Sequence, residues 1–159
     1  MKTPRAEIRK AFYQRLLDGL PIGPITASDI AWPNCMFSPD PSKMYIAPFL
    51  LFGATTVASL SAEGFERLAG VFQVTAYGIL NKGEAALEQV AQDLTDLFRG
   101  GTKLALPDTD REILISTAYG STMQIVTGGK IESGFSQPIL ARPQIVISAN
   151  WQLYIPKGA

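Results

Sequence analysis

Apolar and polar residues alternate most clearly near the end of the chain. From residue 145 to 155, every second side chain is apolar and those between are mostly polar, which is the period of a half-buried strand. The apolar set is Ile145, Ile147, Ala149, Trp151, Leu153 and Ile155. A strand with one wholly apolar face fits a sheet that helices cover on one side only.

Two segments have a helical period instead. Residues 4–18 follow a capping threonine and begin with proline, which favours a helix start. In residues 81–98, Asn81 and Glu84 predict a capping box, and the two glycines that follow predict the helix end. The apolar stripes are Ile8, Ala11, Phe12 and Leu16 in the first helix, and Leu87, Val90, Ala91, Leu94, Leu97 and Phe98 in the second.

Further strands are predicted at residues 43–52, 70–77, 103–106 and 112–119, with 123–127 continuing the sheet. Residues 61–70 are interpreted as a charged turn. Pro48 cannot donate a ladder hydrogen bond, so the strand at 43–52 is expected to be an edge strand or to break there. An apolar edge strand is an aggregation hazard unless another subunit covers it.

These elements predict one α+β domain over residues 1–159, with a mostly antiparallel sheet and two helices packed on one face. The glycine-rich segment 128–138 is expected to form a flexible loop or a projecting hairpin. The uncharged run from 44 to 62 contains Pro48 and Gly53, so strands explain it better than a membrane span.

The amino-acid composition excludes most of the common catalytic mechanisms. The chain has no histidine and a formal net charge of +0, which excludes histidine-dependent catalysis and a global basic field for nucleic acid. The single cysteine, Cys35, cannot form an internal disulfide, and no signal peptide is visible, so an intracellular origin fits. The carboxylates of Asp108, Asp110 and Glu112 alternate, but an ordinary turn explains them. We therefore expect no enzyme, no cofactor and no metal site.

A proline-rich loop carries Trp32, Met36 and Phe37 in the sequence AWPNCMF. These side chains are interpreted either as closing one end of the core or as a contact surface, because aromatic residues anchor many interfaces.

Several motifs together resemble the tail terminator, or tail-completion, proteins of long-tailed bacteriophages. They are the first helix, the W-P-N segment at 32–34, the G-x-F-Q-V strand at 70–74, the glycine turn into the second helix, and the stop at Phe98 and Gly100. The similarity covers most of the chain in order and spacing, except residues 121–143.

The resemblance implies a structural subunit of the virion tail, made in the bacterial host cytoplasm and located at the neck. It implies a homo-hexameric ring that caps the head-proximal end of the tail tube, ends tube polymerisation and contacts the head-completion protein. The implied partners are further copies, the major tail tube protein and the head-completion protein, without membrane or sequence-specific nucleic-acid binding, although DNA would pass through the ring. Candidate contact residues are Trp32, Asn34, Phe37, Tyr45, Phe49, Lys130 and Phe135.

Two other classes remain open from the residues. One is another head–tail connector or minor virion protein, which would also form rings. The other is a small ligand-binding domain or enzyme that uses carboxylates, serine or tyrosine from residues 107–136.

Overall fold

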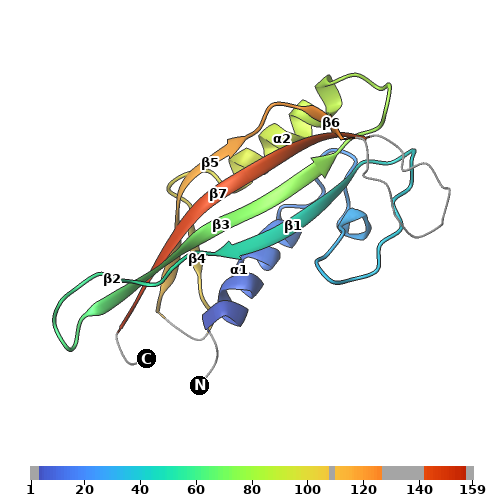
Figure 1. Cartoon of the computed structure of the whole chain (residues 1–159). Helices are drawn as coiled ribbons and strands as arrows, with labels where there is room; N and C mark the ends of the chain where they lie inside the picture. Colours follow the sequence, from blue (N-terminus) through green and yellow to red (C-terminus); the bar gives the residue numbers. More distant parts are fainter. Residues whose placement is uncertain (1–3, 108–109, 127–141, 157–159) are drawn as a thin grey trace, which may run out of the picture.

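One antiparallel sheet forms the front layer of the molecule, and two helices lie behind it (Figure 1). The computed structural model describes residues 4–107, 110–126 and 142–156. The elements are α1 (Pro4–Asp18), η1 (Ala27–Asp29), β1 (Tyr45–Phe52), β2 (Thr56–Val57), β3 (Phe65–Tyr77), α2 (Ala85–Leu97), β4 (Lys103–Ala105), β5 (Glu112–Gly120), β6 (Gln124–Val126) and β7 (Arg142–Pro156). The predicted α+β class and the packing of both helices on one face are confirmed.

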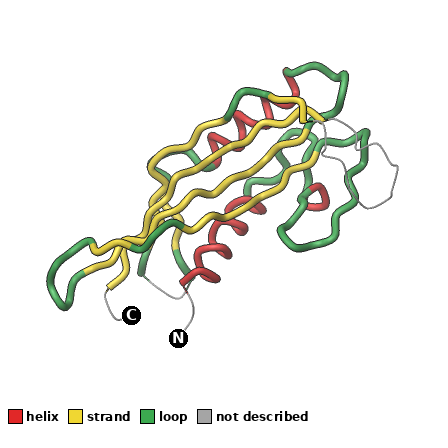
Figure 2. Tube along the Cα trace, viewed as in Figure 1, coloured by secondary structure: helices red, strands yellow, loops and turns green. Residues whose placement is uncertain are grey.

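The strand order is β1-β3-β7-β5-β4, with β2 paired to β3 and β6 paired to β7. The two long central strands, β3 and β7, pair antiparallel along their lengths, from Phe65 opposite Pro156 to Tyr77 opposite Gln144. Figure 2 shows this sheet as neighbouring yellow strands, with β1 as the outer strand on one side. The sequence pattern alone did not reveal this order, because alternation identifies faces but not neighbours.

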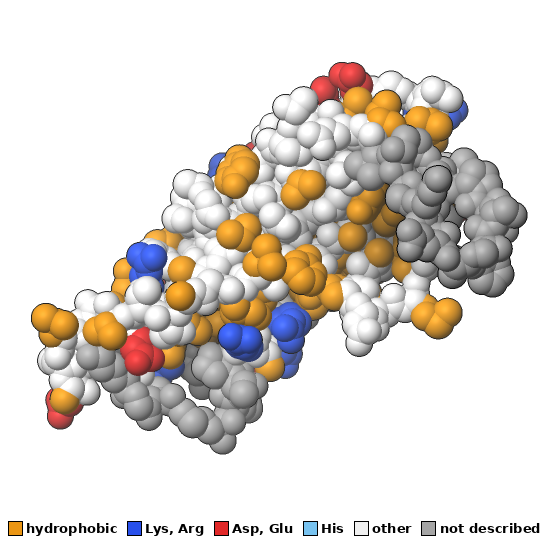
Figure 3. Space-filling view, viewed as in Figure 1, with side chains coloured by type: hydrophobic (Ala, Val, Ile, Leu, Met, Phe, Trp, Pro, Cys, Tyr) orange, Lys and Arg blue, Asp and Glu red, His pale blue; other side chains and the backbone are white. Residues whose placement is uncertain are grey.

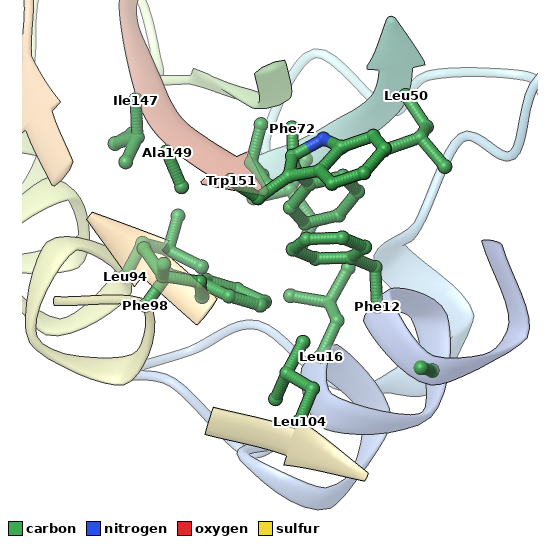
Figure 4. Close-up of a cluster of buried hydrophobic side chains, with 14 of the residues drawn as sticks. Phe12, Leu16, Leu50, Phe72, Leu94, Phe98, Leu104, Ile147, Ala149 and Trp151 are labelled. Carbon is green, nitrogen blue, oxygen red and sulfur yellow. The ribbon is translucent and has the colours of Figure 1, made fainter. Parts of the chain in front are cut away.

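The core lies between the sheet and the helices. The apolar stripe of α1 and the apolar face of β7 are buried as the sequence predicts. Four aromatic rings join the layers (Figure 4): Phe12 of α1 stacks on Phe72 of β3 at 4.7 Å and lies 5.9 Å from Trp151 of β7, while Phe98 lies 5.1 Å from Phe72. Burial of these large apolar side chains ties both helices to the central strands.

Two local predictions are wrong. Strand β3 begins at Phe65, so residues 65–70 are strand rather than a charged turn. Helix α2 begins at Ala85 with Glu84 at its N-cap position, and no side-chain cap bond forms there. Asn81 instead has a φ of 63°, a left-handed conformation that asparagine tolerates in turns. The chain therefore turns at Asn81 and Gly83 before the helix begins.

Strand β2 and the start of β3 project as a hairpin beyond the region that the helices cover (Figures 1 and 2). We call this hairpin the arm and define it as residues 56–67. The arm carries large apolar side chains that are exposed to solvent, namely Val57, Leu60 and Phe65. The predicted loop at 128–138 lies outside the described residues.

Candidate functional site

A groove of about 630 Å³ opens between α1, the loop before β1, and β1 itself. It is lined by Arg9, Tyr13, Leu17, Trp32, Pro33, Asn34, Cys35, Phe49 and Leu50. Tyr13 and Trp32 form part of its wall, with their ring centroids 4.8 Å apart. Burial raises the pKa of Tyr13 above its ordinary value, and the nearby Arg9 partly opposes that rise.

Backbone hydrogen bonds place the loop side of the groove. The N–H of Ala31 donates to the carbonyl of Ile46 at 2.8 Å, which fixes the loop to the start of β1. The N–H of Cys35 then donates to the carbonyl of Trp32 at 3.2 Å and closes a turn. Asn34 has a φ of 56° in this turn, and its side chain is exposed. The turn holds Trp32 against the core and leaves Asn34 and Cys35 at the surface.

The other side of the groove is the open edge of the sheet. Gly53 donates its N–H to Ala69 of β3, while the carbonyl of Ile46 faces the loop. Because backbone groups alternate along a strand, Pro48 has its nitrogen on the side away from β3. Proline therefore removes no hydrogen bond from the β1–β3 ladder, and the expectation of an edge strand is confirmed.

Apolar side chains gather along this edge on the face away from the helices (Figure 3). Phe49 is 51% exposed and Leu51 is 41% exposed. The neighbouring positions of β3 and β7 on that face are Val71, Gln73, Thr75, Val146, Ser148 and Asn150, none of which is charged. An uncharged surface beside an apolar edge can approach another protein without desolvating a charge.

A second cluster forms where the loop before β1 meets the start of β7. Arg142 is buried and donates to the carbonyl oxygens of Asp40, Lys43 and Gly78, the last two at 2.8 and 3.5 Å. Its guanidinium also lies 5.0 Å from the centre of the Tyr45 ring. These contacts make Arg142 a clamp that fixes residues 40–45 to the sheet.

Aromatic rings complete this second cluster. Tyr45 stacks on Tyr77 at 4.5 Å, and Phe37 lies 5.0 Å from Tyr45. Burial raises the pKa of Tyr45, with a smaller contribution from Tyr77. Asp40 accepts hydrogen bonds from the hydroxyl and the N–H of Ser42, at 2.7 and 2.9 Å, and these bonds lower the pKa of Asp40.

The candidate contact residues thus separate into two groups. Trp32, Asn34 and Phe49 line the groove together. Phe37 and Tyr45 belong to the second cluster, where both are half-buried. Lys130 and Phe135 lie outside the described residues.

Sequence reasoning missed the arm as a candidate contact element. Leu60, at its tip, is 98% exposed. The only signal in the sequence was a leucine between two serines in a segment that also contains Glu63 and Gly64. That signal does not separate a projecting hairpin from an ordinary loop.

Within residues 4–107, 110–126 and 142–156, no group of three or more His, Cys, Asp or Glu side chains is placed to hold a metal ion. Among the described helices, none is long and apolar enough to cross a membrane. The groove is mainly apolar in character, and Arg9 contributes to its wall.

Comparison with known proteins identifies the family. No curated protein sequence matches the chain. A solved structure that carries no functional name matches 96% of this chain and 96% of its own length, with 23% identity and a TM-score of 0.67, which shows a shared fold. The model of a family described as phage tail terminator protein matches residues 7–151. The chain therefore belongs to the phage tail terminator protein family, whose members are structural components of phage tails.

Proposed function

We propose that this chain assembles as a hexameric ring on the head-proximal end of the tail tube, where it ends tube polymerisation and presents a surface for head attachment. The observation that carries the proposal is the family match, which extends over residues 7–151. Its partners are further copies of the chain, the major tail tube protein and the head-completion protein. This function is one of binding and assembly, and it requires no catalytic step.

Capping follows from the geometry of a growing polymer. The end of a tube exposes a ring of unpaired subunit surface, and one face of a terminator ring covers it. The opposite face does not match the next tube subunit, so growth ends. A head-to-tail contact between identical subunits closes such a ring only if the rotation between neighbours is suitable.

The open edge of β1 supports assembly with further copies. Phe49 and Leu51 are large, apolar and exposed beside a strand edge that has no neighbouring strand in the described part of the chain. Natural proteins usually protect such an edge with charge, a bulge or a covering segment. Here Pro48 interrupts the outward row of N–H groups but leaves the apolar side chains exposed. Contact with a neighbouring subunit would cover them.

Electron microscopy of polymerising tubes tests the proposal. Purified tail tube protein is allowed to polymerise with and without this chain, which carries a gold-binding tag. We expect label at one end of each tube and no growth from labelled ends after fresh tube protein is added. Label along the tube walls, or growth that continues from labelled ends, would contradict the proposal.

A further inference from the structure

The arm presents an apolar tip that its own chain does not bury. Leu60 is 98% exposed, Val57 is 60% exposed and Phe65 is 50% exposed. They belong to the hairpin of β2 and the start of β3, which projects beyond the region that α1 and α2 cover (Figure 1). A leucine this exposed, with two further apolar side chains on the same hairpin, indicates a contact with another surface.

The tip has a defined backbone rather than the form of an irregular loop. The N–H groups of Ala58 and Ser59 both donate to the carbonyl of Phe65, at 2.9 and 3.2 Å. Gly64 donates to the carbonyl of Ser61 at 3.0 Å, and a Cβ at Gly64 would lie 2.8 Å from Cβ of Ser59. This close turn holds Leu60 outward, which lowers the entropy cost of docking it.

The groove has the complementary chemistry. Its volume of about 630 Å³ lies within the range of roughly 300–1,000 Å³ that protein pockets use for apolar groups. Leu17, Trp32 and Phe49 supply apolar walls. Arg9 adds a positive charge to the wall, and the arm tip carries the negative Glu63 three residues after Leu60. The arm tip thus carries an apolar side chain next to a carboxylate, and the groove has apolar walls next to a guanidinium. The two surfaces are complementary in both apolar character and charge.

We propose that the arm tip of one subunit docks into the groove of the next copy of this chain, with Leu60 as its apolar anchor and Glu63 facing Arg9. This inference rests on the proposed ring, because it assigns the contact that joins neighbouring subunits. The arm and the groove are different surfaces of one chain, so the interface is head-to-tail. Repetition of such a contact forms a closed ring or a filament.

Cysteine cross-linking tests the contact, since the chain's single cysteine, Cys35, is exposed in the groove. The wild-type chain is mixed in equal amounts with a mass-tagged Leu60→Cys, Cys35→Ser variant, at a concentration where light scattering records oligomers or on purified tail tubes. After mild oxidation, we expect the mixed disulfide between wild type and variant to exceed both homodimers severalfold. Leu80→Cys with Cys35→Ser is the matched control, because Leu80 is also an exposed leucine but lies outside the arm.

The outcomes separate the docking contact from the ring itself. Oligomers that form without the mixed disulfide would overturn the arm-to-groove contact and leave the ring intact. A mixed disulfide that is equally abundant with the Leu80→Cys control would overturn it too. Failure to oligomerise both in solution and on tail tubes would overturn the ring, and with it this contact.

Charge reversal provides a second test that needs no oxidation. Arg9→Glu and Glu63→Arg should each raise the dissociation constant of the oligomer severalfold, because each places like charges together. The double variant restores the opposite charges and should recover most of the lost affinity. If the affinity of the double variant is reduced by the sum of the two single effects, Glu63 and Arg9 do not pair. Both side chains are exposed, so circular dichroism should record the same fold in all variants.

Discussion

At the scale of single residues, close contacts around Gly70 leave no room for a side chain at this position of the sheet. Gly70 lies in β3 between Phe52 of β1 and Trp151 of β7. A Cβ at this position would collide with the carbonyl oxygen of Leu51 and lie 2.7 Å from the Trp151 ring. A strand usually disfavours glycine, but here the absence of a side chain allows the indole to lie against the backbone.

We expect Gly70→Ala to lower the free energy of unfolding by about 1–3 kcal/mol, the usual cost of overpacking a core. Gly120→Ala is the matched control, because the nearest side-chain atom to a Cβ there is 3.7 Å away. The control should change stability by less than about 0.5 kcal/mol. Urea unfolding of both variants measures the difference, and equal midpoints for the two would contradict the packing account.

The half-buried tyrosines predict a loss of stability in alkali. Burial raises the pKa values of Tyr13 and Tyr45 in the folded chain above the ordinary value of 10.0. Above that pH the unfolded chain loses these protons while the folded chain retains them, so stability is full below pH 10 and falls as the pH rises. Urea midpoints measured at about pH 8 and about pH 11 should show this fall. The double variant Tyr13→Phe, Tyr45→Phe should show a smaller fall, and an unchanged fall would assign the effect to other groups.

At the scale of the secondary-structure elements, the contacts of Arg142 fix the loop before β1 to the sheet. Its guanidinium donates to three backbone carbonyls and faces the Tyr45 ring. We expect Arg142→Met to lower the free energy of unfolding by about 2–3 kcal/mol, because the variant leaves carbonyls without their charged donor. Arg99→Met, at an exposed arginine, is the control and should change stability by less than about 0.5 kcal/mol. Equal urea midpoints for the two variants would show that Arg142 is not a clamp.

Elements with a clear hydrophobic period could be predicted from the sequence. The apolar stripe of α2 and the apolar face of β7 recur regularly, and the structure buries both, apart from Leu97, which is partly buried. The start of β3 could not be predicted, because the charged Glu66 and Arg67 in the arm interrupt the apolar alternation of the strand. The cap of α2 was predicted wrongly because Asn81 suits both a cap and a left-handed turn, and only the following chain path separates the two.

At the scale of the whole molecule, the groove brings together residues that are far apart in the sequence. The sequence marks Trp32, Asn34 and Phe49 as candidate contact residues one by one, and the structure places them in one groove with Tyr13 and Leu17 of α1. The sequence shows which residue types could form contacts, but it does not show which of these residues lie side by side. It therefore did not assign these residues to one surface. The role of these residues in subunit contacts stays a prediction.

A charge on the open edge of β1 should block assembly. We expect Phe49→Asp to remove the ring, because a carboxylate would have to be desolvated at the covered edge. The fold should survive, since Phe49 is 51% exposed. Leu80→Asp is the control and should assemble as wild type does. Size-exclusion chromatography measures both, and normal assembly of Phe49→Asp would exclude this edge from the interface.

The most direct test of the ring is the mass of the assembled protein. Light scattering across a range of concentrations, followed by imaging of purified tails with the bound protein, records the number of copies. A hexamer has a mass of roughly 103 kDa, which is six times the 17.2 kDa of the chain, and we expect this mass in solution or a six-subunit ring at one tail end. A 17.2 kDa species at every concentration that also fails to bind tail ends would exclude the proposed ring.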